Sequence, residues 1–294
     1  MKLNYLLFFF PLIFFSCNST NQEMNTPETI DLTAALKEGN TLNISELSDQ
    51  INYVRLETKS ECLTGPRLKA YSNEKYILTI DRDKMLLFNK ISGNFIREIG
   101  EKGRSPESYL RTFGVMPFNE EKNSVYAGGN NRILEYSVDG ELIKSVPSPE
   151  LTSEIGNFGN DAFVAYIPNY MGNEKRRLIV FDDSGAVLRN FPNYFSSPNR
   201  GAIVVWNPHS WFYKLENRLC FYELFTDTLF QVRQDTLIPR FVFNMGEWAP
   251  PYESNTVPGI EPEKYFFMNT VTESSRYLFC SFNFNRNSYT VVFD

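Results

Sequence analysis

The sequence predicts an all-β fold, a β-propeller of four-stranded blades, from a strand pattern and its repetition. Residues Tyr76–Gly103 contain three short runs of apolar and β-branched residues separated by two polar turns, which is the pattern of antiparallel strands. The second turn recurs at intervals of 45 to 51 residues, at Gly93, Gly140, Gly185 and Thr236. This period is typical of propeller blades.

Each strand of the first copy is predicted from its own residues. Tyr76–Asp81 and Phe95–Ile99 alternate, and Met85–Phe88 is a short apolar run. Gly93 supplies the positive φ that a tight hairpin turn requires. A three-stranded meander cannot bury both of its faces alone, so its repetition favours sheets stacked face to face. The apolar residues lack helical spacing, which argues against helical repeats of similar length. A β-sandwich or an irregular β-barrel is the alternative fold.

Four successive blades follow from the aligned turns, at about 68–103, 113–146, 155–191 and 202–245. Before them we expect a short helix at Leu32–Leu36 and a strand at Ile51–Glu57, which in a closed propeller completes the last blade and removes a sheet edge. After them, Gly246–Glu263 is rich in proline and acidic residues. It predicts a long surface loop, either one that lines a binding mouth or an idle connection.

The last residues predict part of a fifth blade. Tyr277–Phe284 and Tyr289–Phe293 are expected to be its first strands, and the sequence ends at Asp294, before the expected outer strand. We therefore expect about four complete blades and a partial fifth, as a C-terminally truncated propeller or as one with an unusual closure.

The N-terminus predicts export and lipid attachment. Leu3–Phe15 is an apolar run that is too short to span a bilayer and suits the core of a signal peptide, expected at residues 1–16. Ser16 and Cys17 resemble the end of a bacterial lipobox, so Cys17 is expected to carry acyl chains that hold the protein at a membrane. An ordinary signal peptide is the alternative. Residues 17–44 are expected to form a polar, lipidated tether, and residues 45–294 the propeller domain.

The composition excludes one class of partner. The chain of 294 residues has a net charge of −6 and no cluster of basic residues, so nucleic acid is not an expected partner. Its 26 Phe and 16 Tyr residues suit packing between stacked sheets, because flat rings bury a large area with few rotatable bonds.

Few residues are placed for catalysis. The sequence has no nucleophile elbow of the G-x-S-x-G type, which argues against a catalytic triad that uses the single histidine, His209. His209 is therefore expected to be a packed or hydrogen-bonded loop residue. Cys62, Cys220 and Cys280 match no zinc pattern. They are expected to be buried free thiols, with a disulfide between Cys220 and Cys280 as the alternative.

Acidic pairs offer the one candidate for metal binding, at Asp81/Asp83 and Asp182/Asp183. Propeller lactonases and related hydrolases hold Ca²⁺ in the central tunnel with oxygen ligands of this kind. Because both pairs fall next to turns, solvated turn aspartates are favoured. No cofactor and no metal is therefore predicted, and calcium is the alternative.

Several segments carry a resemblance to a known family. The segments that carry the resemblance are Ile51–Thr58, Met85–Phe88, Phe95–Gly100, Asp227–Val232, Leu237–Phe241 and Gly246. In them the sequence resembles the six-bladed β-propeller lipoproteins of Bacteroidetes, an uncharacterised group. The resemblance covers about 45–294 and implies a six-bladed propeller at the outer membrane, on its periplasmic or its surface side. Two departures are evident. The relatives' loop G-x-G-P-G-E-Y reads GRSPESY here, at 103–109, and the last blade of the family is not expected in this sequence.

These observations favour a non-catalytic binding or scaffold protein, which presents loops at 103–109, 196–211 and 248–261 to a glycan, a peptide or a protein partner. The residues expected to contact the ligand are Arg104, Glu107, Tyr109, His209, Trp211 and Trp248. One alternative is a calcium-assisted hydrolase or lyase with its site in the propeller tunnel. The other is the non-functional remnant of a truncated gene.

Overall fold

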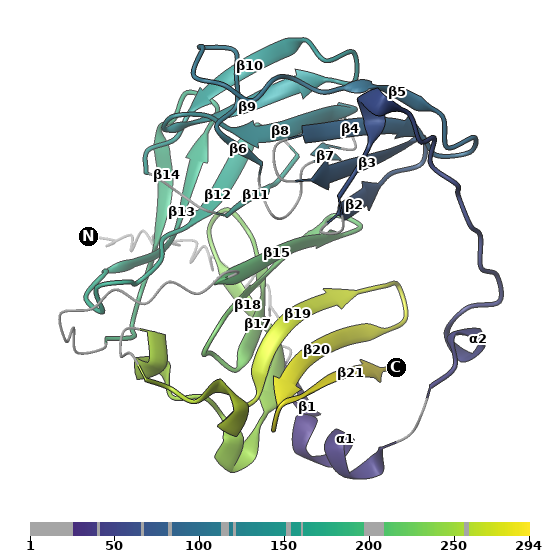
Figure 1. Ribbon diagram of the computed structural model, residues 1–294. Coiled ribbons are helices and arrows are strands. Elements are labelled where there is room, and N and C mark those ends of the chain that lie inside the picture. The colour runs from purple at the N-terminus through teal and green to yellow at the C-terminus, as the bar shows by residue number, and fades with distance from the viewer. Residues whose placement is uncertain are drawn as a thin grey trace, which may run out of the picture.

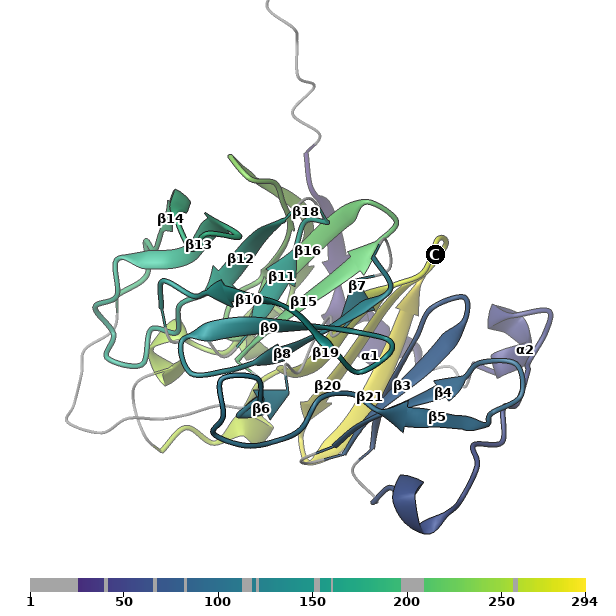
Figure 2. The same ribbon diagram turned by 90° about the horizontal axis from the view of Figure 1, so that it is seen from above.

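Five β-sheets succeed one another around a centre as the blades of a β-propeller (Figures 1 and 2). The computed structural model describes residues 26–39, 42–65, 68–81, 84–112, 118–119, 122–150, 154–159, 161–196, 209–255 and 259–294. The prediction of a mostly β propeller is confirmed. We number the sheets blade 1 to blade 5 in chain order.

Blade 1 contains four antiparallel strands: β2 (Lys69–Ser72), β3 (Tyr76–Asp81), β4 (Lys84–Asn89) and β5 (Phe95–Glu98). The β4–β5 turn bends at Gly93, whose φ of +71° favours glycine. The Asn89 side chain accepts hydrogen bonds from the amides of Ile91 and Ser92 and so fixes the turn. The three strands predicted for Tyr76–Gly103 are confirmed.

Blades 2 and 3 repeat this order. Blade 2 consists of β6 (Arg111–Thr112), β7 (Phe118–Asn119), β8 (Ser124–Gly128), β9 (Arg132–Ser137) and β10 (Leu142–Pro147), with β6 and β7 both paired to β8. Blade 3 consists of β11 (Ile155–Asn157), β12 (Ala162–Tyr166), β13 (Arg176–Asp182) and β14 (Val187–Pro192). The turn before each outermost strand again contains a positive-φ glycine, Gly140 or Gly185. The recurring turn is therefore one structural element in three blades.

Blade 4 has an additional strand from the N-terminal part of the chain. Its order is β15 (Ser210–Leu215), β16 (Arg218–Glu223), β17 (Thr228–Val232), β18 (Leu237–Asn244) and, parallel to β18, β1 (Glu28–Asp31). Helix α1 (Leu32–Glu38) follows. Asp31 caps it, because its Oδ1 accepts hydrogen bonds from the amides of Thr33 and Ala34. Ile30 and Leu32 are buried in the core. Residues 28–38 therefore belong to the folded domain and not to the predicted tether, because these two apolar side chains dock the segment on blade 4.

Blade 5 contains three strands: β19 (Phe267–Glu273), β20 (Leu278–Phe284) and β21 (Asn287–Phe293). The two segments expected to be its first strands are its second and third, since β19 precedes them. The described part of the connection from blade 4 holds three 3₁₀ turns, η2 (Gly246–Trp248), η3 (Tyr252–Asn255) and η4 (Pro262–Lys264). The long connection predicted between blades 4 and 5 is confirmed.

Residues 42–65 run along the side of the molecule from blade 5 to blade 1 (Figure 1). They contain α2 (Ile44–Leu47) and one 3₁₀ turn, η1 (Ser60–Cys62). The strand predicted at Ile51–Glu57 is wrong, because an alternating sequence becomes a strand only where a neighbouring strand offers a ladder. Instead, the Glu57 amide donates to the Gly93 carbonyl at 2.9 Å, and the Phe95 amide donates to the Glu57 carboxylate. Neither α-helix in the described ranges is long or apolar enough to cross a membrane.

The core lies between the sheets, because alternate side chains of a strand point to opposite faces. On blade 1, Leu78 and Leu87 pack against Leu134 of blade 2. Their neighbours Leu86 and Phe88 point the other way and are covered by the segment around Leu56 and Cys62.

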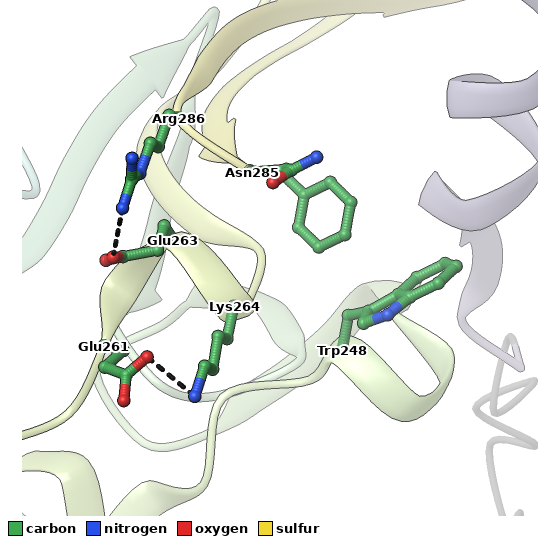
Figure 3. A pocket seen from close by; sticks show the side chains of 7 residues that line it. Trp248, Glu261, Glu263, Lys264, Asn285 and Arg286 are labelled. Atoms are coloured by element: carbon green, nitrogen blue, oxygen red, sulfur yellow. Dashed lines mark ion pairs between the residues drawn. The ribbon is translucent and has the colours of Figure 1, made fainter.

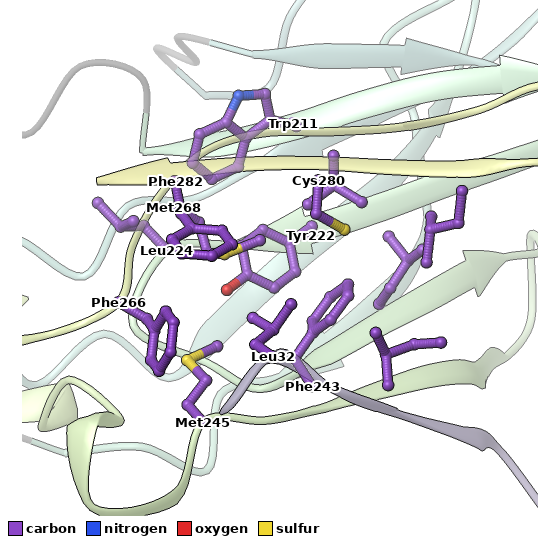
Figure 4. Packing of buried hydrophobic residues seen from close by; sticks show 14 of the residues in the cluster. Leu32, Trp211, Tyr222, Leu224, Phe243, Met245, Phe266, Met268, Cys280 and Phe282 are labelled. Carbon is purple, nitrogen blue, oxygen red and sulfur yellow. The ribbon is translucent and has the colours of Figure 1, made fainter. Parts of the chain in front are cut away.

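The largest cluster lies between blades 4 and 5. Figure 4 shows Trp211, Tyr222 and Phe243 of blade 4 packed with Phe266 and Phe282 from blade 5 and the segment before it. The three cysteines at positions 62, 220 and 280 are buried and unbridged, as predicted.

Candidate functional site

One end of the propeller carries the connections between blades. Successive strands alternate in direction, so the outer strand of one blade ends where the inner strand of the next begins. We call this end the connecting face. It includes residues 99–110, 193–196, 245–255 and 259–266, and the hairpin turns 129–131 and 285–286. All six residues expected to contact a ligand lie in these connections or at the start of the strand that follows.

The six predicted residues do not converge on one site, although Glu107 and Tyr109 both contact Tyr136. Arg104 lines a small pocket. The Glu107 carbonyl accepts a hydrogen bond from the Tyr136 hydroxyl at 2.6 Å, and the fully buried Tyr109 ring meets the Tyr136 ring edge-on. Trp211 is buried in the blade 4–blade 5 core beside Tyr222.

Trp248 lines a larger pocket, of about 580 Å³, between the connection that leads into blade 5 and the β20–β21 hairpin (Figure 3). The pocket is open and has the size of a small-molecule site. Its lining residues come from the connection and from the β20–β21 hairpin: Trp248, Glu261, Glu263, Lys264, Phe284, Asn285 and Arg286. We call it the Trp248 pocket.

The apolar wall of the Trp248 pocket is held by ring contacts. The Trp248 ring lies 5.2 Å from the Phe284 ring, and Phe284 is stacked on Phe266 at 5.0 Å. The Phe266 amide donates to the Trp248 carbonyl at 3.0 Å. Because Phe266 is itself fully buried, the two rings that face the pocket rest on the protein core.

The rim of the Trp248 pocket carries two ion pairs, drawn as dashed lines in Figure 3. Lys264 pairs with Glu261 at 2.6 Å, and Arg286 pairs with Glu263 at 3.8 Å. The pairing raises the pKa of Lys264. Arg286 has a φ of +63°, a conformation in which a non-glycine residue is strained. Since the charges pair with one another, the pocket is close to neutral and rich in donors and acceptors.

His209 belongs to a buried polar network between blades 3 and 4. The Tyr166 hydroxyl donates to Glu223 Oε1 at 2.9 Å and lies 2.7 Å from His209 Nδ1. Since a phenol has one proton to give, His209 Nδ1 carries a proton and donates to Tyr166. Arg177 Nε donates to Glu223 Oε2 at 2.6 Å. The prediction that His209 is a packed, hydrogen-bonded residue is confirmed.

The connection that carries Trp248 also closes this network. Tyr252 donates a long hydrogen bond to Glu223, at 3.4 Å, and its ring is stacked on Phe195 at 4.3 Å. Asn169 Nδ2 donates to the Tyr252 hydroxyl at 3.4 Å. The network therefore anchors residues 245–255, and with them the pocket wall.

Glu154 is a second buried acid, just before the innermost strand of blade 3. Its Oε2 has no hydrogen-bond partner among the described residues. Burial raises the pKa of the carboxyl from 4.5 to about 7, and the charges of Lys69 and Arg111 partly oppose this rise. Both basic residues lie on the innermost strands of blades 1 and 2, which places the three groups around the propeller axis.

The acidic pairs do not converge in the part of the chain that the structure describes, where no three His, Cys, Asp or Glu side chains lie close enough to hold a metal ion. Asp182 Oδ1 accepts hydrogen bonds from the amides of Ser184 and Ala186, as expected of a turn aspartate. Asp83 lies outside the described residues. The calcium-assisted hydrolase or lyase stays a prediction.

The fold and the connecting face define a β-propeller protein with pockets at the blade boundaries. The chain belongs to the family described as Domain of unknown function (DUF4934), whose model matches residues 27–294. No curated protein matches the sequence.

Two solved structures are similar in outline. The crystal structure of a presumed exported protein of Bacteroides fragilis is 21% identical, with a TM-score of 0.66, and the match covers 83% of this chain and 73% of that one. It supports the propeller fold. Dihydro-heme d1 dehydrogenase NirN is 11% identical, with a TM-score of 0.38, over 75% of this chain and 53% of its own, which is too distant to support an argument.

Replacing Glu223 by Gln tests the buried network. The substitution leaves the Arg177 charge buried without its counter-charge, and we expect the free energy of unfolding to fall by about 3–5 kcal/mol. Glu261→Gln is the matched control, because it removes one charge from an exposed pair and is expected to cost less than about 1 kcal/mol. Urea unfolding measures both. Equal losses in the two variants would contradict the structural role of the network.

Glu154 predicts a pH dependence of stability. The folded state keeps a proton that the unfolded chain releases between about pH 4.5 and 7, so the free energy of unfolding falls as pH rises through this window, by about 3 kcal/mol. Glu154→Gln should remove this contribution. Urea unfolding of both proteins across the window measures it, and identical pH profiles would refute the assignment.

Proposed function

We propose that the protein is an exported, lipid-anchored β-propeller that binds a partner on its connecting face without catalysing a reaction. The Trp248 pocket is the proposed ligand site. Of the three ligand classes expected from the sequence, a glycan, a peptide or a protein, we favour a neutral glycan.

The observation that carries this proposal is the pairing of an aromatic wall with a neutral polar rim. Trp248 and Phe284 offer ring surfaces to an apolar face of the ligand. Asn285 and the charged side chains around it offer donors and acceptors to hydroxyl groups. A pyranose ring has this combination of faces. The rim charges already pair with one another, so a strongly charged ligand has no unpaired partner there.

The anchor is proposed from the N-terminal sequence. Residues 1–25, with Cys17 and the signal segment, lie outside the described residues. The lipobox-like Ser16-Cys17 supports attachment to the outer membrane, on either side of it. The likeness to a presumed exported Bacteroides protein supports export. The six-bladed architecture is proposed on the resemblance of the sequence to the six-bladed β-propeller lipoproteins of Bacteroidetes.

Trp248→Ala tests the ligand site. A glycan array probed with the wild-type chain identifies the ligand, and titration calorimetry then compares the two proteins. Loss of an aromatic contact at the centre of a site costs about 2 kcal/mol or more, so we expect the dissociation constant to rise by about 30-fold. Tyr53→Ala is the matched control, since Tyr53 is 91% exposed and outside the pocket. Equal affinity in wild type and Trp248→Ala would reject this pocket.

Cys17→Ala tests the anchor in cells that process bacterial lipoproteins. The wild-type chain should sediment with membranes and incorporate labelled fatty acid, whereas the variant should do neither. Cys62→Ala serves as a control, because that thiol is buried in the folded domain. Membrane attachment of the Cys17 variant would show that acylation at this residue is not the anchor.

A further inference from the structure

A second pocket on the connecting face, of about 310 Å³, lies at the boundary between blades 1 and 2. It is formed by the connection that follows β5 and by the β8–β9 hairpin. Its lining residues are Gly103, Arg104, Ser105, Ser108, Leu110, Asn130 and Arg132. Its volume is at the small end of the range for ligand sites. We call it the Arg132 pocket.

The lining of the Arg132 pocket carries positive charge and no negative charge. Its lining has two guanidinium groups, two hydroxyls and one amide, and no acidic side chain. The whole chain, in contrast, has a net charge of −6. Arg132 Nε is buried and has no hydrogen-bond partner among the described residues. A buried charged donor without an acceptor is costly, and no acidic side chain of the lining offsets the two arginine charges, so the pocket is suited to an anionic ligand.

The β8–β9 hairpin has room for the Arg132 side chain over its own backbone. The β8–β9 hairpin closes with a hydrogen bond from the Gly129 amide to the Arg132 carbonyl at 2.9 Å. The Arg132 side chain lies so close over Gly129 that a Cβ at that position would be 2.7 Å from Cγ and 2.8 Å from Nε. Glycine is therefore required for this arrangement of the guanidinium.

On the serine side of the pocket, a glycine again lies directly against a lining side chain. A Cβ at Gly103 would lie 2.9 Å from the Ser108 hydroxyl. The Ser105 and Ser108 hydroxyl oxygens are 2.7 Å apart. One of the two hydroxyls donates to the other, which leaves the proton of the acceptor available for a ligand.

We propose that the Arg132 pocket binds one oxyanion group: a sulfate, a phosphate or a carboxylate. Guanidinium groups form forked, charge-assisted hydrogen bonds with such groups. The serine hydroxyls and the Asn130 amide add neutral donors. The group comes either as a free inorganic ion or as a substituent of a sugar. This site is separate from the Trp248 pocket, which lies over a different pair of blades.

Calorimetric titration of the full chain at constant ionic strength in chloride tests the proposal. The probes are inorganic sulfate, inorganic phosphate, N-acetylglucosamine 6-sulfate, glucose 6-phosphate and glucuronate. We expect at least one of these probes to bind although chloride is present in excess. Tighter binding of a sugar ester than of the free ion identifies a substituted sugar as the source, and equal binding identifies the ion itself. No binding of any probe would overturn the proposal.

Variants assign the binding to this pocket. Arg132→Gln and Arg104→Gln should each weaken it by about 10- to 100-fold, which is the loss of a hydrogen bond to a charged group. Ser108→Ala should weaken it by about threefold or more without a change in charge. Arg233→Gln is the matched control, because this exposed arginine lies in the turn between β17 and β18, away from the connecting face.

Two outcomes separate this proposal from the glycan site. Unchanged binding in Arg132→Gln and Arg104→Gln, with the melting temperatures of all variants within a few degrees, would overturn the oxyanion site. Trp248→Ala should leave oxyanion binding intact, so failure of the glycan proposal does not affect this one.

Discussion

Face-to-face packing of thin sheets is the constraint on which the rest of this structure depends. The inner blades 2, 3 and 4 pack against a blade on each face, and aromatic rings take part in these contacts. Tyr126 of blade 2 meets Phe163 of blade 3 at 5.6 Å and 84°, and Tyr166 of blade 3 meets Phe221 of blade 4 at 5.7 Å. A three- or four-stranded sheet has nothing to bury its apolar faces against on its own, so every blade is stabilised by the elements packed on it.

The same stacking creates the candidate sites. It places the connections between blades on the connecting face, and each pocket lies between such a connection and a hairpin of the blade that the connection leads into. Polar residues from two blades also meet there below the surface. The Arg177–Glu223 pair joins β13 to β16, and Tyr252 ties the loop above to that pair. The position of Trp248 in the larger pocket therefore depends on a network in which Trp248 takes no direct part.

Local pattern in the sequence was sufficient for the blades and for the loops that carry Arg104 and Trp248. It was insufficient wherever pairing is non-local. Ile51–Glu57 alternates but has no partner strand in the described chain, whereas Glu28–Asp31 carries little strand pattern and pairs with β18. Arg132 was not predicted as a site residue for the same reason, since the pairing of β6 with β8 brings the Arg104 loop beside the β8–β9 hairpin. The sequence offers one signal for it, a basic residue three positions after the hairpin glycine Gly129.

A double-mutant cycle across a blade boundary tests the packing account most directly. Tyr126→Leu, Phe163→Leu and the double variant are compared by urea unfolding, which yields the coupling energy between two rings on different sheets. The account predicts a coupling of about 0.5–1.5 kcal/mol, the value for a buried edge-to-face pair. A coupling indistinguishable from zero, with additive effects of the two substitutions, would contradict it.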